Sequence, residues 1–381
     1  MGLVMTRVLI LHPALAPYRI DLFNQLATQC ELEVVFLRDA VKEQAFDRAK
    51  LEAQLHCRYR YLVNGWDWHN HLFRRGIGGI LREFRPDIVV PCEFGVQTVQ
   101  LLNWPGRRFK IVSSVDDSPA MAQADNWKNR YLKPFLLKRL AGVIVCSEAV
   151  RRIYAEQFSL PTAKIAVCPV LQDTNSLREK MLAGREAALT FLKQYQLAGR
   201  KTVLYVGRLT AVKNLPLLLR AFAAGADADA RLLIIGDGEQ RSELEALARQ
   251  LAIADRVVMP GRYDGNELYA WYWLGKLFVL PSTFEPFGAV VNEALAAGMP
   301  CLVSAAAGAA DLLASPAAGA TFSPDDETTL TSQLRQRLAT MPELDGTLST
   351  LPPAVLSCDL SHYTAGLAAF FRTLTESDSC L

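Results

Sequence analysis

The chain has 381 residues, of which 51% are hydrophobic and 21% charged, and this length is sufficient for two domains that each bury a hydrophobic core. Its apolar runs are far shorter than the roughly 20 residues that a membrane-spanning helix needs, so no such helix is predicted. The eight cysteines are scattered, without the close spacing of zinc or thioredoxin-like motifs. They are therefore expected to be free thiols in a reducing compartment.

The small net charge of +2 hides an uneven distribution. Residues 1–170 contain 23 basic and 16 acidic side chains, whereas the remainder contains 18 basic and 23 acidic ones. A basic half and an acidic half imply different binding partners for the two parts of the chain.

Short apolar runs alternate with helical patterns through the first half of the chain. Strands are predicted at 7–12, 33–37, 87–91, 110–115 and 141–147, and helices at 20–30 and 148–158. The opening apolar run is predicted to be the first strand instead of a signal peptide, because the periodic pattern continues directly from it.

Two stretches of the first half mix aromatic and basic residues. The stretch 58–75 suits an acceptor groove or an anionic membrane surface, but it is equally compatible with an exposed hairpin that carries a packed aromatic patch. The stretch 126–140 is predicted to be helical, with either a solvated charged face or a face directed to a membrane or polyanion.

The second half repeats the alternation of strands and helices. Strands are predicted at 202–206, 231–235, 257–259, 276–280 and 301–303, and helices at 240–253, 289–297 and 362–374. This order predicts two α/β domains with mostly parallel sheets and with ligand sites at the carboxyl ends of the strands. The expected divisions are 1–170, 171–361 and a final segment of 362–381.

The most informative stretch is PSTFEPFGAVVNEALAAG at 281–298, where a strand, a sharp turn and a helix follow one another. Gly288 has no Cβ and permits close approach of a ligand, and the start of the helix offers unpaired amides to a phosphate. Glu285 in the turn and Glu293 two helical turns further on can both accept hydrogen bonds from a polyhydroxylated ligand.

A second motif, which contains basic residues, follows the strand at 202–206. Gly207 and Arg208 come directly after the strand, and Lys213 follows within the same loop. A guanidinium and an ammonium group in such positions can hold a diphosphate from two sides.

Taken together, these motifs resemble the donor site of the retaining glycosyltransferase family 4, whose fold, GT-B, has two Rossmann-like domains facing across a cleft. The resemblance implies that Glu285 contacts the donor sugar and Glu293 the ribose, while Arg208 and Lys213 bind the diphosphate. The donor-binding residues that it implies are Gly207, Arg208, Lys213, Arg262, Tyr263, Glu285, Phe287, Gly288, Ala289, Val290 and Glu293. It also implies that the final helix returns to the first domain.

The first half departs from the family in two places. The loop 14–19 lacks the paired glycines that many members place near the donor phosphates, and it reads Ala-Leu-Ala-Pro-Tyr-Arg instead. Tyr18 and Arg19 in this loop are candidate acceptor contacts. Asp116 and Asp117 stand where many members have a His-Asp pair, so Asp116 or Ser114 is expected to replace the histidine.

The resemblance implies a metal-independent hexosyltransferase without a cofactor, in which Glu285, Arg208, Lys213 and Asp116 are the catalytic candidates. The donor is expected to be a nucleoside diphosphate sugar, with UDP favoured and GDP next. The acceptor is expected to be a glycan or lipid-linked molecule of polysaccharide or glycolipid assembly, and the location cytoplasmic or peripheral on the inner face of the membrane, with no nucleic acid as a partner. Two alternatives stay open, an epimerase acting on the nucleotide sugar and an inactive nucleotide-sugar-binding protein.

Overall fold

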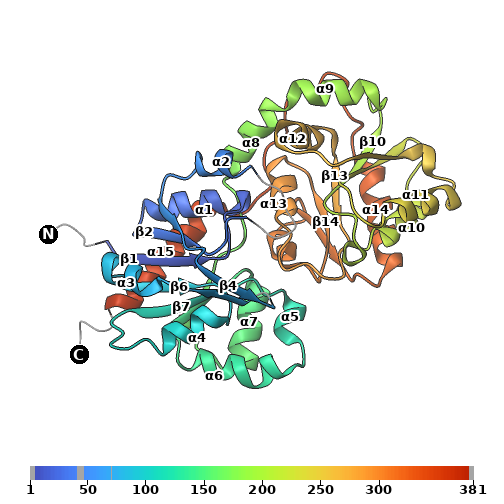
Figure 1. The fold of residues 1–381 in the computed structure, drawn as a ribbon. Helices are drawn as coiled ribbons and strands as arrows, with labels where there is room; N and C mark the ends of the chain where they lie inside the picture. The colour runs from blue at the N-terminus through green and yellow to red at the C-terminus, as the bar shows by residue number, and fades with distance from the viewer. Residues whose placement is uncertain (1–4, 41–46, 70, 377–381) are drawn as a thin grey trace. The chain divides into compact units, whose positions relative to one another are not determined.

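The computed structural model describes residues 5–40, 47–69 and 71–376 of the chain (Figure 1). The described residues fall into two compact units. The first comprises those up to Asp173 together with those from Cys358 onward, and the second is Thr174–Ser357. The expected divisions were 170/171 and 361/362.

The first unit is built on a seven-stranded sheet in the order β3-β2-β1-β6-β7-β8-β9. All its strand pairs are parallel, and apolar side chains fill most strand positions, because helices cover both faces of such a sheet. The strands are β1 (Arg7–His12), β2 (Glu31–Phe36), β3 (Arg58–Tyr61), β6 (Ile88–Pro91), β7 (Lys110–Val115), β8 (Gly142–Val145) and β9 (Ile165–Val167).

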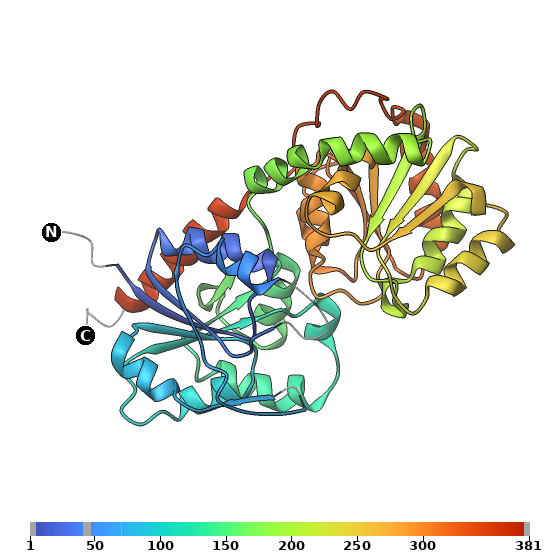
Figure 2. The same cartoon turned by 45° about the horizontal axis from the view of Figure 1, so that its top comes forward.

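Helices connect these parallel strands. They are α1 (Pro17–Ala27), α2 (Arg48–Glu52), α3 (Ile77–Phe84), α4 (Val96–Leu102), α5 (Pro119–Gln123), α6 (Lys133–Leu137), α7 (Glu148–Gln157) and the final α15 (Leu360–Glu376). Helix α15 returns to the first unit and packs beside α1 and β9 (Figure 2). None of the helices within the described residues is both long and apolar enough to cross a bilayer.

The second unit has a six-stranded parallel sheet in the order β12-β11-β10-β13-β14-β15. Its strands are β10 (Lys201–Val206), β11 (Ala230–Ile235), β12 (Val257–Gly261), β13 (Leu277–Leu280), β14 (Cys301–Ser304) and β15 (Gly319–Phe322). Its helices are α8 (Thr174–Ala183), α9 (Arg185–Gln194), α10 (Leu215–Gly225), α11 (Arg241–Gln250), α12 (Gly265–Leu274), α13 (Ala289–Ala296) and α14 (Glu327–Thr340).

Each sheet contains one point at which the order of its strands reverses. In the first unit the chain proceeds outward from β1 to β3 and then starts again on the other side of β1 with β6. In the second unit it proceeds from β10 to β12 and starts again on the other side of β10 with β13. Loops diverge at such a switch point and leave a crevice at the carboxyl ends of the strands, which is where α/β proteins bind ligands.

The aromatic and basic stretch 58–75 forms two separate elements. Its first part is the edge strand β3, and its second part is an antiparallel hairpin of β4 (Gly65–Trp68) and β5 (His71–Arg74). Trp66 and Trp68 are 53% and 61% exposed, so the hairpin does carry an uncovered aromatic face.

The stretch 126–140 is helical over most of its length, as predicted, but it begins with a π-helical turn over Lys128–Leu132 that leads directly into α6. Lys133 does not belong to the solvated face, because its side chain is only 9% exposed and its Nζ lies 2.5 Å from the buried carboxylate of Asp117. The Tyr154 hydroxyl donates to the same carboxylate over 2.6 Å. Lys133 is therefore a buried partner of Asp117, although the sequence analysis assigned the charged residues of 126–140 to a solvated, membrane-directed or polyanion-directed face.

This buried network predicts a difference between two lysines of one segment. Lys133→Ala leaves the Asp117 charge buried without its cation and should lower the free energy of unfolding by about 3 kcal/mol. Lys138→Ala removes an exposed side chain and should change it by no more than about 0.5 kcal/mol. Urea unfolding of both variants measures the difference, and equal midpoints would contradict the buried role of Lys133.

Candidate functional site

The predicted donor residues meet at the switch point of the second unit. Lys213 ends a short 3₁₀ turn after β10, and Glu285 lies in the turn after the adjacent strand β13. The Lys213 ammonium donates to the Glu285 carboxylate, and the two side chains are only 15% and 13% exposed. The structure therefore brings together two of the residues that the sequence nominated, although they lie 72 positions apart.

The turn that carries Glu285 is fixed by backbone hydrogen bonds to two other loops. Thr283 donates its N–H to the carbonyl of Val212 over 2.9 Å, and the N–H of Ala309 donates to the carbonyl of Phe287 over 2.8 Å. Gly288 has a φ of 98°, and a Cβ there would lie 2.8 Å from the Leu280 side chain. Only glycine fits this position without displacing its neighbours.

Arg208 belongs to the same end of the sheet. Its side chain is exposed, and its carbonyl accepts a hydrogen bond of 2.8 Å from the hydroxyl of Tyr205. Burial raises the pKa of Tyr205, the nearby charge of Glu285 raises it further, and the charge of Arg208 opposes both. The phenol thus lies within the electrostatic reach of both groups, so two cations and one carboxylate share this switch point.

Glu293 lies on α13 and accepts a hydrogen bond from Tyr272 of α12. Burial, followed by the charge of Glu293, raises the pKa of Tyr272 well above its ordinary value, so the phenol stays a donor to this carboxylate. Tyr272 therefore orients Glu293, whose side chain is partly exposed.

The remaining predicted donor residues differ in what they offer. Phe287 is 5% exposed, so its side chain packs in the interior. Ala289 and Val290 begin α13, where the first amides have no partner within the helix. Arg262 is exposed, whereas the ring of Tyr263 packs at 5.6 Å from that of Trp271.

The first unit has a hollow of about 240 Å³ at its own switch point. Its wall includes the loop after β1 and residues that follow β2, β6 and β7. Tyr18 and Arg19 also line it, but they lie in the first turn of α1, which begins at Pro17, and not in a loop as the sequence predicted. The Arg19 Nη2 lies 2.7 and 2.9 Å from the two carboxylate oxygens of Asp116. This ion pair joins the loops after β1 and β7 across the end of β6, which lies between them in the sheet.

The ion pair sets the charge state of the hollow. Burial by itself would raise the pKa of Asp116, but the charge and hydrogen bonds of Arg19 outweigh burial and hold it below its ordinary value. The side chain of Arg19 is 8% exposed. Its Nε is buried and has no hydrogen-bond partner among the described residues.

Among the residues of the hollow that were not selected from the sequence, His12 and Glu93 carry perturbed pKa values. Burial and the charge of Arg19 lower the pKa of His12 to about 4, so its ring is neutral at pH 7. Desolvation by the surrounding protein, followed by the charge of Asp116, raises the pKa of Glu93 to about 7, although the residue keeps an exposed surface. Strongly perturbed groups in a hollow are typical of functional sites.

Glu93 also has an unusual backbone conformation. Its φ is 60°, a left-handed value that costs a non-glycine residue of order 1 kcal/mol. Three hydrogen bonds hold it there: its N–H donates to Ser114 over 2.7 Å, and its carbonyl accepts from Thr98 over 2.6 Å and from Ser113 over 2.8 Å. The left-handed backbone marks Glu93 as unusual in the structure. The sequence around a single glutamate does not predict such a conformation.

Of the residues expected in the first unit, Tyr18, Arg19, Ser114 and Asp116 all line the hollow. Asp117, which follows Asp116, instead points into the interior toward Lys133. The two neighbouring aspartates therefore have separate roles, one in the hollow and one in the core.

Comparison with known families gives the same division of the chain. The profile described as "Glycosyltransferase Family 4" matches residues 18–175, and the one described as "Glycosyl transferases group 1" matches residues 190–344. The chain belongs to the group 1 glycosyltransferases. The two profiles together match most of both units.

Curated relatives of this glycosyltransferase match it over part of their length. An uncharacterized glycosyltransferase of Methanocaldococcus jannaschii is 32% identical over 173 residues, 45% of this chain and 44% of the relative. An alpha-D-kanosaminyltransferase of Streptomyces kanamyceticus is 28% identical over 171 residues, 44% of this chain and 42% of the relative. The chain thus spans less than half the length of these relatives.

Solved structures identify the fold of this glycosyltransferase as GT-B. The Anabaena HepE protein, crystallised with UDP and glucose, superposes with a TM-score of 0.68 at 17% identity and covers 99% of this chain and 100% of its own. A lipopolysaccharide outer core galactosyltransferase superposes with a TM-score of 0.67 at 17% identity, covering 97% of this chain and 99% of its own. The predicted pair of Rossmann-like domains is confirmed.

The raised pKa of Glu93 predicts a pH-dependent effect on the stability of this glycosyltransferase. Between its ordinary value of 4.5 and about 7, the folded protein binds more protons than the unfolded chain at this site. The free energy of unfolding therefore falls as the pH rises through this window. Glu93→Gln should raise the melting temperature relative to the parent at pH 8 and not at pH 4.

Glu83 is a control of opposite sign, because its hydrogen bond from Arg60 lowers its pKa. Glu83→Gln should destabilise the protein at pH 8 and have less effect at low pH. Calorimetric scans at both pH values provide the comparison, and a Glu93→Gln effect that is independent of pH would exclude the proposed titration.

Proposed function

We propose that this glycosyltransferase moves a hexose-type sugar from a nucleoside diphosphate sugar to a hydroxyl group of a glycan or lipid-linked acceptor, with retention of the anomeric configuration and without a metal ion. The proposal rests on the cluster of Arg208, Lys213 and Glu285 at the switch point of the second unit. It places the donor there and the acceptor in the hollow of the first unit.

The charges of the second switch point suit a diphosphate. In the transfer, the bond from the anomeric carbon to the diphosphate oxygen breaks and its electron pair stays on the diphosphate. The acceptor oxygen bonds to the same carbon and its proton passes to the departing diphosphate. Arg208 and Lys213 would stabilise the negative charge that builds up on the leaving group. Lys213 would share its ammonium between the diphosphate and Glu285, which in turn would orient the sugar.

UDP is the first choice for the nucleotide and GDP the second. The structurally similar Anabaena protein was crystallised with UDP and with UDP-glucose, which supports this order. Glu293, oriented by Tyr272, would accept hydrogen bonds from the ribose hydroxyls. The backbone of Arg262 and Tyr263 would contact the base.

The acceptor is proposed to bind in the hollow of the first unit. Arg19 would supply the donor, and Asp116 and Glu93 would supply carboxylate oxygens as acceptors, a set that suits hydroxyl groups. The neutral ring of His12 lies in the same wall.

The proposal predicts that Glu293→Ala weakens the binding of UDP. The ribose hydroxyls would lose a charged acceptor, which costs about 1.5 to 3 kcal/mol, or about tenfold to a hundredfold in Kd. Titration calorimetry with UDP, GDP and ADP on the parent and the variant measures the loss and ranks the bases. Glu267→Ala, an exposed glutamate of α12, is the control that should bind as the parent does. Equal UDP affinities for Glu293→Ala and parent would remove Glu293 from the donor site.

The two cations are predicted to act mainly on departure of the diphosphate. Replacing Arg208 or Lys213 with alanine should lower kcat more than it raises the KM for the donor, because the charge on the leaving group is larger in the transition state. Full activity in the presence of a chelator would support independence from metal. A loss confined to KM would show that both residues only bind the donor. Conversion of the nucleotide sugar in the absence of an acceptor would identify an epimerase.

A lipid-linked acceptor would require the protein to reach a membrane surface, and the segment 127–139 is the proposed contact. Trp127, Tyr131 and Phe135 follow one another at a spacing of four, which places them on one side of the helical segment. They are 63%, 67% and 56% exposed. The exposed cations beside them are Lys128, Arg130, Lys138 and Arg139.

We therefore predict preferential binding to anionic vesicles, with each basic residue near the surface contributing about 1 kcal/mol at low salt. The bound fraction should decrease as salt screens the charges. Sedimentation with anionic and neutral vesicles would compare the parent with a variant neutralised at the four exposed cations, leaving the buried Lys133 intact. Equal binding to both kinds of vesicle would favour a soluble acceptor.

A further inference from the structure

The hairpin of β4 and β5 has one buried and one uncovered face. Cross-strand register pairs Trp66 with Phe73 and Asp67 with Leu72, so the aromatic residues point to the face opposite Leu72 and Arg74. Leu72 and Arg74 are 6% and 8% exposed, and they hold the hairpin against the first unit.

The polar groups on the buried face of the hairpin find hydrogen-bond partners that do not involve the aromatic side chains. The guanidinium of Arg74 donates to the carbonyl of Leu37 over 2.6 Å and to the carboxylate of Asp67 over 2.7 Å. Arg38 donates to the same carboxylate over 3.0 Å, and the side-chain amide of Gln97 donates to the carbonyl of Leu72. The aromatic side chains are therefore not needed to anchor the hairpin.

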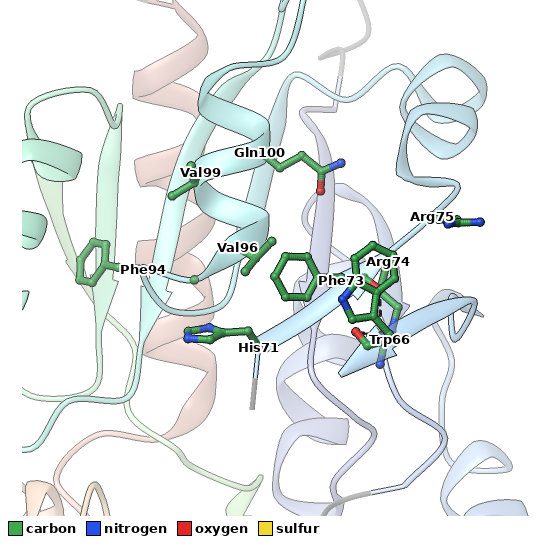
Figure 3. A pocket seen from close by; sticks show the side chains of 10 residues that line it. Trp66, His71, Phe73, Arg74, Arg75, Phe94, Val96, Val99 and Gln100 are labelled. Atoms are coloured by element: carbon green, nitrogen blue, oxygen red, sulfur yellow. Dashed lines mark hydrogen bonds between the residues drawn. The ribbon is translucent and has the colours of Figure 1, made fainter. Parts of the chain in front are cut away.

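The uncovered face forms one wall of a groove of about 580 Å³, and helix α4 forms the other (Figure 3). The rings of Trp66 and Phe73 are parallel, with an interplanar angle of 5° and centroids 5.1 Å apart. Figure 3 shows Val96 and Gln100 reaching from α4 toward Phe73. Flat apolar walls with a few polar groups at the rim are typical of sites for small ligands.

The charges of the groove have one sign. Among the residues that the structure describes, no carboxylate lines it, and Arg75 lies with its guanidinium 5.8 Å from the centroid of the Trp66 ring. Arg75 makes no ion pair within the part of the chain that the structure describes. An acidic group of a ligand that lies against the Trp66 and Phe73 rings could form an ion pair with the Arg75 guanidinium, which already lies beside Trp66.

The groove adjoins the polar hollow at the switch point. Cys92 and Glu93 line the hollow, and the next residues of the same loop, Phe94 and Gly95, line the groove. Neighbouring Cα atoms are about 3.8 Å apart, so the linings of the hollow and the groove meet within this loop.

We propose that the groove binds a second sugar ring of the acceptor saccharide, stacked on Trp66 and Phe73, with an acidic substituent directed to Arg75. This inference rests on the proposed function, because it makes the groove an extension of the acceptor site in the hollow. The acceptor is then a saccharide of at least two rings whose penultimate ring carries a carboxylate or a phosphate.

The test measures saccharide binding to the full chain in the absence of a donor. Trigalacturonic acid serves as the carboxylated probe, maltotriose as the neutral one, and a phosphorylated maltotriose distinguishes phosphate from carboxylate. Trp66→Ala should weaken the binding of the acidic probes at least about tenfold, whereas Trp66→Phe, which keeps a stacked ring, should retain most of it. Arg75→Ala should abolish the preference for acidic over neutral probes.

Trp68→Ala is the matched control, since Trp68 is an exposed residue on the same face of the hairpin but lies outside the groove. It should bind the acidic probes as the parent does. Equal losses for Trp66→Ala and Trp68→Ala, equal affinity for maltotriose, or no binding of any probe would each overturn the inference. Tighter binding of dodecyl phosphate than of both acidic saccharides would overturn it in favour of a lipid chain.

Binding of UDP to the same protein separates the two proposals. If UDP binds and is sensitive to Glu293→Ala while the saccharides fail, only the groove assignment is wrong. If the acidic saccharides bind through Trp66 and Arg75 while UDP does not bind, the groove assignment stands and the donor assignment is wrong.

Discussion

The ion pair between Lys213 and Glu285 is the interaction on which the candidate donor site depends. It joins the loops that follow β10 and β13, and these two strands flank the switch point of the second sheet. Because both side chains are mostly buried, neither charge can lose its partner without a cost of several kcal/mol. A bound diphosphate can accept hydrogen bonds from the Lys213 ammonium in place of some of those to Glu285. The Glu285 carboxylate is then available to the sugar that it would orient.

The first unit uses the same arrangement with a different balance of charge. Arg19 and Asp116 bridge the end of β6 from the two neighbouring strands. Their charges cancel, His12 is neutral at pH 7, and the carboxyl group of Glu93 has a pKa of about 7. The second switch point places Arg208 and Lys213 beside Glu285, which suits a diphosphate. The hollow of the first is lined by Arg19, Arg38, Asp116 and Glu93, a mixed set of donors and acceptors that suits hydroxyl groups.

The sequence predicted the parts of the fold and site that depend on local patterns. The strand, turn and helix around Glu285 and Gly288 could be predicted because apolar runs and glycines act within a few residues. The short edge strand β15 (Gly319–Phe322) was not predicted, because its sequence GATF is a weak strand signal. Helix α14, which follows it, was not predicted either. Glu93 and His12 were missed because burial, neighbouring charge and a left-handed φ arise only when distant segments meet.

The aromatic stretch 58–75 shows most clearly where reasoning from sequence ends. Its composition was equally compatible with a groove, a membrane surface and an exposed hairpin, because composition does not specify register. Pairing that differed by one residue would turn Asp67 and Leu72 outward and bury Trp66 and Phe73. The observed register is fixed from the other side, by the hydrogen bonds of Arg74 and Gln97 to distant carbonyls. An uncovered aromatic face is thus a consequence of polar contacts on the buried face, and only the three-dimensional structure makes both faces visible at once.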